Sequence, residues 1–355
     1  MILFLAAAAA IWLAGWALKA PRQARWLMIG LLYILTLALL LLLPPGAALH
    51  RALGGSVEMW LLLGGFAAIG FAYVQGLRAL KSRVRPENRE PDPAPEPEPD
   101  PRAPLSDDEL DRYMRQILLR EVGGPGQMKL KRAKVLVIGA GGLGAPVLQY
   151  LAAAGVGTIG VIDDDTVDVS NLHRQIIHTA ERTGMPKVFS AQMALREINP
   201  HVLVRPYHQR LDDGIAAELI AEYDLVLDGT DNFATRYLVN RTCAETSTPL
   251  ISGAITQWEG QLSLFDPAGG GPCYQCVFPE APAPGLVPTC AEAGVIGPLP
   301  GVIGSMMAVE ALKYLAEAGQ PLRGEMVLYD ALWGENRKLR LKARADCPVC
   351  QGRGA

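Results

Sequence analysis

The sequence predicts an α/β domain with a largely parallel sheet, preceded by three transmembrane helices. Residues 1–80 are overwhelmingly apolar, whereas the rest of the 355-residue chain has the mixed composition of a soluble domain. From residue 133 onward, apolar strands run into glycine-rich or polar turns and then into helical segments. This order is typical of a parallel sheet with helical crossovers.

Three apolar runs in the N-terminal part have the length of membrane-spanning helices. They cover residues 1–18, 26–43 and 57–77, and each is about long enough to cross a ~30 Å hydrocarbon core. The first run lacks the basic start of a signal peptide, since no Lys or Arg precedes Lys19. No ionisable residue lies deep within a run, which favours a membrane anchor over a transport path.

Positive charge predicts how these spans are oriented. Basic residues separate the first two runs and follow the third, namely Lys19, Arg22, Arg25, Arg78, Lys81, Arg83 and Arg85. The loop between the second and third runs contains only two residues that can carry positive charge, His50 and Arg51. Because positive charge marks the cytoplasmic side, we expect an inner-membrane protein with its N-terminus outside and everything after Arg78 in the cytoplasm.

A proline-rich acidic segment follows the anchor. Residues 86–104 read PENREPDPAPEPEPDPRAP, a composition that cannot bury a core and favours extended polyproline II. We therefore expect a spacer between the anchor of residues 1–85 and a domain of residues 105–355. Ser106 and Glu109 have the spacing of a capping box, which predicts a helix at the start of that domain.

A glycine-rich turn predicts a phosphate site. Residues 133–144 read AKVLVIGAGGLG, a buried strand followed by a turn in which Gly139, Gly141 and Gly144 fit G-x-G-x-x-G. The glycines let the backbone approach a phosphate, and the following helix N-terminus favours the anion. A second strand ends at Asp163, where a carboxylate can hold a ribose hydroxyl. These features alone also fit an NAD-dependent Rossmann oxidoreductase, which remains an alternative.

Two further polar segments are less typical of a dehydrogenase. Residues 163–175 (DDDTVDVSNLHRQ) include Arg174 and are followed by Lys187, and residues 224–232 (DLVLDGTDN) form a strand that runs into a turn with Asp231. Turns at the carboxyl ends of parallel strands form the ligand crevice. Two cations beside an aspartate suit a triphosphate with Mg²⁺, because the cations offset phosphate charge and the carboxylate takes the metal.

Four of the six cysteines form two CxxC pairs, Cys273 with Cys276 and Cys347 with Cys350. Two such pairs can supply a tetrahedral Zn²⁺ site with four thiolates and no open position, so the zinc would be structural. It would attach the end of the chain to the body of the domain. Disulfides are the weaker interpretation for a cytoplasmic domain, as is a redox CxxC, which would begin a thioredoxin-like βαβ unit.

Together these motifs resemble the ThiF/MoeB/HesA family, relatives of the ubiquitin-activating enzymes. The resemblance runs from about Arg112 to Cys350 and covers RYMRQILL, GAGGLG, SNLHRQ, GMPK, LDGTDN, PCYQC, PTCAEAGVIGP and CPVC in the family's order. The stretch around Cys290 is most similar to the molybdopterin-synthase adenylyltransferases. The three apolar runs and the acidic proline segment are additions to the usual family pattern.

The resemblance implies a Rossmann-like ATP site with Mg²⁺. The residues that it assigns to the nucleotide and its phosphates are Gly142, Asp163, Ser170, Asn171, Arg174 and Lys187. Asp231 would orient Mg²⁺, with Asn232 adjacent. Arg115 would reach ATP across a subunit interface, so the family implies a homodimer. Cys290 is either a packing cysteine or, by the resemblance, a candidate nucleophile for a thioester or sulfur-linked adduct.

The function implied is adenylation of a ubiquitin-like sulfur carrier that ends in Gly-Gly, such as a molybdopterin synthase small subunit or a ThiS-like protein. The carrier's carboxylate would attack the α-phosphorus of ATP and release pyrophosphate, and a separate protein would then donate sulfur. A catalytically inactive membrane scaffold is a further alternative, against which the presence of Arg115, Arg174, Lys187 and Asp231 argues. The formal net charge of −3 gives no sign of nucleic-acid binding.

Overall fold

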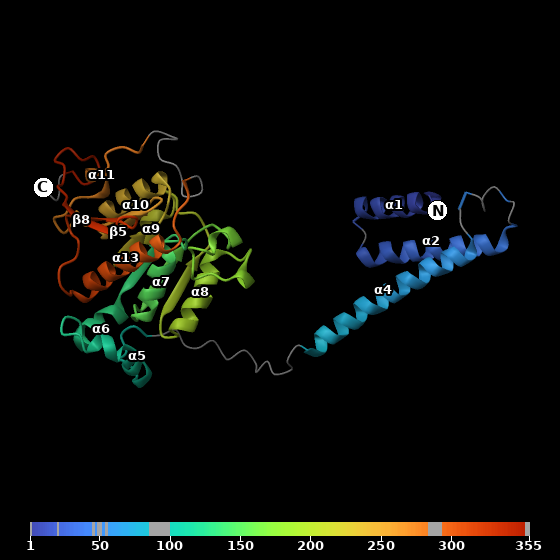
Figure 1. The fold of residues 1–355 in the computed structure, drawn as a ribbon, viewed down its shortest axis with the longest axis horizontal. Coiled ribbons are helices and arrows are strands. Elements are labelled where there is room, and N and C mark those ends of the chain that lie inside the picture. Colours follow the sequence, from blue (N-terminus) through green and yellow to red (C-terminus); the bar gives the residue numbers. More distant parts are fainter. Residues whose placement is uncertain are drawn as a thin grey trace. The chain divides into compact units, whose positions relative to one another are not determined.

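The computed structural model describes residues 2–19, 21–44, 47, 52–53, 56–84, 100–282 and 293–351. The chain forms two compact units, Met1–Glu96 and Pro97–Ala355 (Figure 1). Most of the predicted spacer, residues 86–99, lies outside the described residues. The predicted boundaries at residues 85 and 105 therefore remain predictions.

The first unit consists of the apolar helices α1 (Ile2–Ala17), α2 (Arg22–Leu42) and α4 (Val57–Val84). An aromatic cluster packs them together: the Phe4 ring lies 6.4 Å from that of Tyr33 and 5.0 Å from that of Trp60. The Tyr33 hydroxyl donates to the main-chain carbonyl of Trp60. Among the described residues of this unit, the buried side chains are Thr36, Leu40, Leu53 and Trp60.

Helix length and composition mark two candidate membrane spans in this unit, Ala24–Leu42 and Val57–Gly76. The apolar segment Leu3–Ala17 is shorter than these. A third window of sufficient length, Pro298–Ala316, lies in the second unit, where half of it is buried. Length and composition therefore also select a core helix, and the three predicted spans remain a prediction.

The second unit contains one eight-stranded sheet in the order β3-β2-β1-β4-β5-β6-β7-β8. The first five strands are parallel and the last three pair antiparallel, which confirms the predicted α/β fold with a largely parallel sheet. The strands are β1 (Lys134–Ile138), β2 (Thr158–Ile162), β3 (Leu203–Tyr207), β4 (Leu225–Asp228), β5 (Leu250–Ile255), β6 (Glu259–Phe265), β7 (Glu325–Asp330) and β8 (Glu335–Arg340).

Helices cover both faces of the sheet, so the central strands are apolar on both sides. Val135 and Val137 of β1 face a core that α7, α8 and α13 complete, while Leu136 and Ile138 face the core of α9 and α10. The helices are α5 (Asp107–Ile117), α6 (Gly123–Arg132), α7 (Gly144–Ala153), α8 (Lys187–Ile198), α9 (Ala216–Ala221), α10 (Phe233–Thr246), α11 (Tyr274–Val277) and α13 (Pro298–Ala316), with 3₁₀ turns at Val169–Asn171 and Ala180–Arg182.

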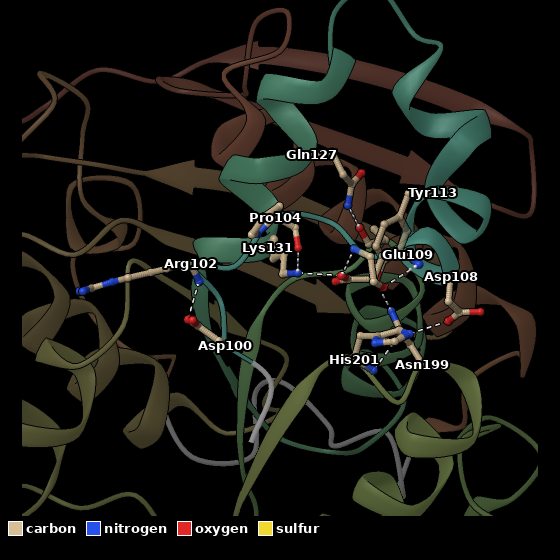
Figure 2. Close-up of polar contacts among 12 residues, drawn as sticks. Asp100, Arg102, Pro104, Asp108, Glu109, Tyr113, Gln127, Lys131, Asn199 and His201 are labelled. Atoms are coloured by element: carbon tan, nitrogen blue, oxygen red, sulfur yellow. Dashed lines mark hydrogen bonds and ion pairs between the residues drawn. The ribbon is translucent and has the colours of Figure 1, made fainter. Parts of the chain in front are cut away.

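A buried ion pair fixes the start of this unit (Figure 2). The predicted capping box is present at the start of α5, where Glu109 Oε2 accepts from the main-chain N–H of Ser106 at 2.9 Å. Lys131 Nζ donates to the same carboxylate at 2.7 Å and to the Pro104 carbonyl at 3.2 Å. Burial opposes ionisation of Glu109, but the bonds from Lys131 and Ser106 outweigh it and hold its pKa below the usual value.

Two further contacts connect α5 to the segment after α8 (Figure 2). Asn199 Nδ2 donates to the Tyr113 hydroxyl at 2.7 Å. His201 Nε2 lies 2.5 Å from Asp108 Oδ2, and this bond lowers the pKa of Asp108. α5 is thus held on the domain at both its first turn and its middle.

Candidate nucleotide site and cysteine cluster

The turns after β1, β2 and β4 lie at one edge of the sheet, which we call the nucleotide edge. Ile138, the last residue of β1, pairs in register with Ile162 of β2 and with Asp228 of β4, so the three strands end level. The strand order reverses between β1 and β4. Such a reversal opens a ligand crevice at the carboxyl ends of the strands.

The glycine turn after β1 requires glycine on steric grounds. Gly139 has φ +93°, in the left-handed region that side chains disfavour. A Cβ on Gly144 would lie 1.9 Å from the carbonyl oxygen of Gly139, and one on Gly142 would lie 3.1 Å from Pro300. Gly141 has more room, since the nearest atom to its Cβ would be Gln175 Nε2 at 3.5 Å. The turn therefore brings backbone to the edge without side chains in the way.

Asp163 lies beside this turn, as the sequence predicts. Its Oδ2 accepts from the main-chain N–H of Ala140 at 2.7 Å, and its Oδ1 accepts from that of Asp165 at 2.8 Å. Asp163, Asp164 and Asp165 place carboxylate oxygens within 4.8 Å of one another. The nucleotide edge thus has a strongly acidic side after β2.

Arg174 approaches the glycine turn from the segment after β2. Its Cγ would lie 3.9 Å from a Cβ on Gly142. Its Nη2 donates to Asn171 Oδ1 at 2.5 Å and its Nη1 to the Ser170 carbonyl at 3.4 Å. The Ser170 hydroxyl donates to Asp168 at 2.5 Å and lowers the pKa of that carboxyl. Three predicted site residues, Ser170, Asn171 and Arg174, therefore form one local hydrogen-bonded group.

Lys187 opens α8 and is nearly buried, with 5% of its side chain exposed. Its Nζ donates to Asp165 Oδ2 at 2.7 Å, while Asp165 itself is largely exposed. Lys187 is therefore a buried cation whose carboxylate partner faces solvent. The sequence predicted the lysine but not its aspartate partner.

Asp231 and Asn232 lie in the turn after β4. Asn232 caps α10, because its Oδ1 accepts from the main-chain N–H of Thr235 at 2.9 Å. Asp231 is exposed at the tip of the turn. Beneath it lie two buried charged residues that the sequence reasoning missed, Asp228 and Arg236, which are 1% and 6% exposed. The only local signals were an acidic residue at the end of an apolar strand and a basic residue in the first turn of the following helix.

Two buried polar side chains under the glycine turn were also missed. His178 lies 2.9 Å from both the Ala140 carbonyl and Ser190 Oγ through its two ring nitrogens. Burial lowers the pKa of His178, so the ring is neutral at pH 7. Gln175 is 5% exposed, and its Oε1 has no hydrogen-bond partner among the described residues.

Arg115 does not join the other predicted residues within one chain. It lies exposed in the last turn of α5, and within the described parts its side chain makes no hydrogen bond or ion pair. Cys290 lies outside the described residues, since residues 283–292 are not among them.

The four cysteines of the two CxxC pairs form a single cluster, which we call the cysteine cluster. Cys273 Sγ lies 3.8 Å from that of Cys276 and 3.5 Å from that of Cys347, and Cys276 lies 3.4 Å from Cys350. A tetrahedron with ~2.3 Å Zn–S bonds has S–S edges of about 3.8 Å, so the group fits the ion. Burial raises the pKa of Cys276, a cost that a divalent cation would offset.

A family model described as the ThiF family matches residues 113–349. The chain belongs to the ThiF family. The match contains the glycine turn, the polar segments and the cysteine cluster, whereas the three helices of the first unit lie outside it. The predicted family and the predicted enzyme class, nucleotidyl transfer, are confirmed.

Relatives of this ThiF-family chain carry related names. The sulfur carrier protein adenylyltransferase of Thermus thermophilus is 54% identical over 247 residues, which cover 68% of the chain and 91% of that relative. The SAMP-activating enzyme E1 of Haloferax volcanii is 48% identical and matches 69% of the chain and 90% of that protein. The adenylyltransferase and sulfurtransferase MOCS3 of Sus scrofa is 47% identical over 70% of the chain, which spans 55% of MOCS3.

Solved structures show the same fold at low identity. E. coli MccB in its crystal structure with ATP superposes with a TM-score of 0.61 at 23% identity, over 67% of the chain and 74% of MccB. PaaA superposes with a TM-score of 0.59 at 22% identity, over 67% of the chain and 75% of PaaA. The chain therefore shares the fold of these structures over about two thirds of its length.

Proposed function

We propose that the chain uses ATP to adenylate the C-terminal Gly-Gly carboxylate of a ubiquitin-like sulfur carrier, such as a molybdopterin synthase small subunit or a ThiS-like protein. One observation carries the proposal: in a ThiF-family chain, the glycine turn, Asp163, Arg174 and Lys187 converge at the nucleotide edge. The 54% identity to a protein named sulfur carrier protein adenylyltransferase supports the choice of substrate.

The reaction forms a bond between a carboxylate oxygen of the carrier and the α-phosphorus of ATP. The bond from that phosphorus to the bridging oxygen breaks, and pyrophosphate leaves with the electron pair. The protein's part is positioning and charge stabilisation. The glycine turn, with Gly142 at its centre, receives the nucleotide, and Asp163 holds the ribose. Arg174 and Lys187 bind the phosphates, for which Lys187 gives up Asp165.

Arg115 acts from a second copy of the chain, so the proposed enzyme is a homodimer. Its exposed position and lack of an ion-pair partner among the described residues support this role. Mg²⁺, when bound, offsets negative charge on the phosphates. Asp231, exposed at the turn after β4, is the proposed ligand, and its neighbour Asn232 keeps the turn in place by capping α10.

The cysteine cluster is proposed to hold a structural Zn²⁺. The four buried Sγ atoms within 4.8 Å support this, and they leave no ligand position for a substrate. Cys290 is proposed as a nucleophile for the later transfer of sulfur from a separate donor protein.

The first unit is proposed to anchor the enzyme in the inner membrane by three spans, with the N-terminus outside. Residues 86–104 act as the spacer, and residues 105–355 form the cytoplasmic catalytic domain. Two helices with windows of spanning length, one shorter apolar helix and the basic residues around Arg78 support this topology.

ATP–pyrophosphate exchange tests the proposal. We expect the full-length chain to exchange labelled pyrophosphate into ATP only when a carrier ending in Gly-Gly is present, and not when its last two glycines are removed. Parallel assays with a molybdopterin-synthase-type and a ThiS-type carrier identify the substrate. Exchange with neither carrier would show that the proposed carrier class is not the substrate.

A further inference from the structure

The turn that carries Asp231 rests on a buried ion pair. Asp228 ends β4 and Arg236 lies in α10, and their Oδ2 and Nη1 atoms are 3.7 Å apart. Both side chains are excluded from solvent. A buried pair of this kind is weak evidence for stability, because well-packed apolar residues often serve the fold equally well. Its bonding pattern points to another role.

Arg236 connects α10 to strand β5 and to the turn after β4. Its Nη1 donates to Ser252 Oγ at 3.0 Å and its Nη2 to the Gly253 carbonyl at 2.8 Å, both in β5. Nη2 also donates to the carbonyl of Thr230. The planar guanidinium makes these bonds in fixed directions, which a lysine cannot reproduce. Arg236 therefore holds the turn at a set distance from the neighbouring strand.

Asp228 also holds this turn. Its Oδ1 accepts from the main-chain N–H of Thr230 at 2.9 Å and from the Thr230 hydroxyl at 2.7 Å. The N–H, hydroxyl and carbonyl of Thr230 are thus all bound to the pair. Because the peptide group is planar, fixing the Thr230 carbonyl also fixes the Cα atom of Asp231.

The helix that carries Arg236 also contacts the cysteine cluster. Asn232, Arg236 and Asn240 are spaced by four residues and share one face of α10. Asn240 Oδ1 accepts from the main-chain N–H of Tyr274 at 2.8 Å, and its Nδ2 lies 3.9 Å from Cys273 Sγ. Over ~12 Å of helix, this face connects the turn of Asp231 to the first CxxC pair.

We propose that Arg236, with Asp228, is a positioning residue that orients Asp231 toward the Mg²⁺ ion, and that Asn240 ties this support to the cysteine cluster. The inference rests on the proposed role of Asp231 as a metal ligand. In this role Arg236 and Asp228 determine the Mg²⁺ affinity without touching the ion, because they fix the position of its ligand Asp231.

The test is the effect of Mg²⁺ on ATP binding, measured by calorimetry on the full-length chain in detergent, with either MgCl₂ or EDTA present. In Arg236→Met we expect the Mg²⁺ affinity of the ATP complex to fall by about 10- to 100-fold. ATP affinity in EDTA should be unchanged. Arg241→Met is the matched control, because Arg241 lies on the same helix but pairs at the surface with Asp213.

Milder variants keep the test decisive if Arg236→Met does not fold. Ser252→Ala removes one acceptor of the guanidinium, and Asp228→Asn keeps the shape while removing the charge; both should weaken Mg²⁺ binding by a smaller factor. Variants that unfold at lower temperature but retain the wild-type Mg²⁺ effect would overturn the inference, as would Mg²⁺-independent ATP binding by the wild type. If the wild type binds ATP with Mg²⁺ but exchanges no pyrophosphate with any carrier, the proposed substrate is wrong and the positioning role still stands.

Discussion

The nucleotide edge and the cysteine cluster differ in whether their functional side chains find their partners within one chain. At the edge, Asp231 is exposed, and the ion-pair partner of Lys187 among the described residues is Asp165, which is itself exposed. In the cluster, four buried thiols lie at the spacing of a closed tetrahedron. The first arrangement has room for ligands, and the second only for an ion. The proposed reaction site thus has charged groups open to solvent, whereas the four thiols of the proposed structural site are buried.

The largest expected effect concerns Arg115, because it tests whether the edge is completed by a second copy. We expect Arg115→Ala to reduce pyrophosphate exchange by about 10³-fold or more, as for other arginines supplied in trans. Mixing Arg115→Ala with Asp231→Ala should restore part of the activity, since a mixed dimer contains one intact site. Arg120→Ala, which removes another exposed cation close by, is the control. Failure of the mixture to recover activity would place Arg115 in its own subunit's site.

Substitution of a cysteine in the cysteine cluster should change both the stability and the metal content of the protein. We expect Cys347→Ser to lose bound Zn²⁺ and to lower the free energy of unfolding by about 5 kcal/mol, since metal binding there is folding free energy. Metal analysis and thermal unfolding measure both quantities. Cys243→Ser removes a buried thiol outside the cluster and should leave the Zn²⁺ content unchanged. Full Zn²⁺ content in Cys347→Ser would contradict the closed site.

The smallest expected effect concerns Glu109 and Lys131, a buried pair that is complete within the chain, like the cluster. Breaking such a pair leaves an unpaired buried charge, so Glu109→Gln should lower the free energy of unfolding at pH 7 by about 3 kcal/mol. Folding holds the pKa of Glu109 below the ordinary 4.5. The carboxylate therefore stabilises the fold above pH ~4.5 and loses this effect as the pH falls through the folded pKa.

Unfolding of wild type and Glu109→Gln across pH 3 to 7 measures this contribution, and the two curves should converge toward acid, over about two pH units. Glu121→Gln, at a surface pair with Arg120, should shift stability little at any pH. If the difference in free energy of unfolding between the wild type and Glu109→Gln grew as the pH fell, the proposed contribution of the ion pair would be wrong.

Local patterns explain why much of this fold was predictable. Three features form as predicted: the capping box at Ser106, the glycine turn after β1 and the paired cysteines. Each is specified by a sequence pattern of only a few residues. The end of β2 at Ile162 was also predictable, because its apolar run stops there and three aspartates, residues 163–165, follow. These signals are local because backbone geometry or ligand spacing dictates the residue types.

Long-range pairing explains what the sequence did not reveal. β8 reads ENRKLR and is exposed throughout, so it has no apolar alternation by which to recognise a strand. α13 has the composition of a membrane span, yet it packs against α7 and strands β5 and β6 as part of the core. The pair of Asp228 and Arg236 is formed by the fold alone, because neither residue is unusual in its local sequence.

The most direct test of the account is to detect the acyl-adenylate itself. Full-length chain, MgATP and a carrier ending in Gly-Gly are mixed with inorganic pyrophosphatase, which draws the reaction forward, and the carrier is examined by intact-mass spectrometry. We expect a carrier that has gained one adenylyl group at its C-terminal glycine, and no gain with Asp231→Ala. A carrier left unmodified by the wild type, while MgATP binds at the nucleotide edge, would contradict it.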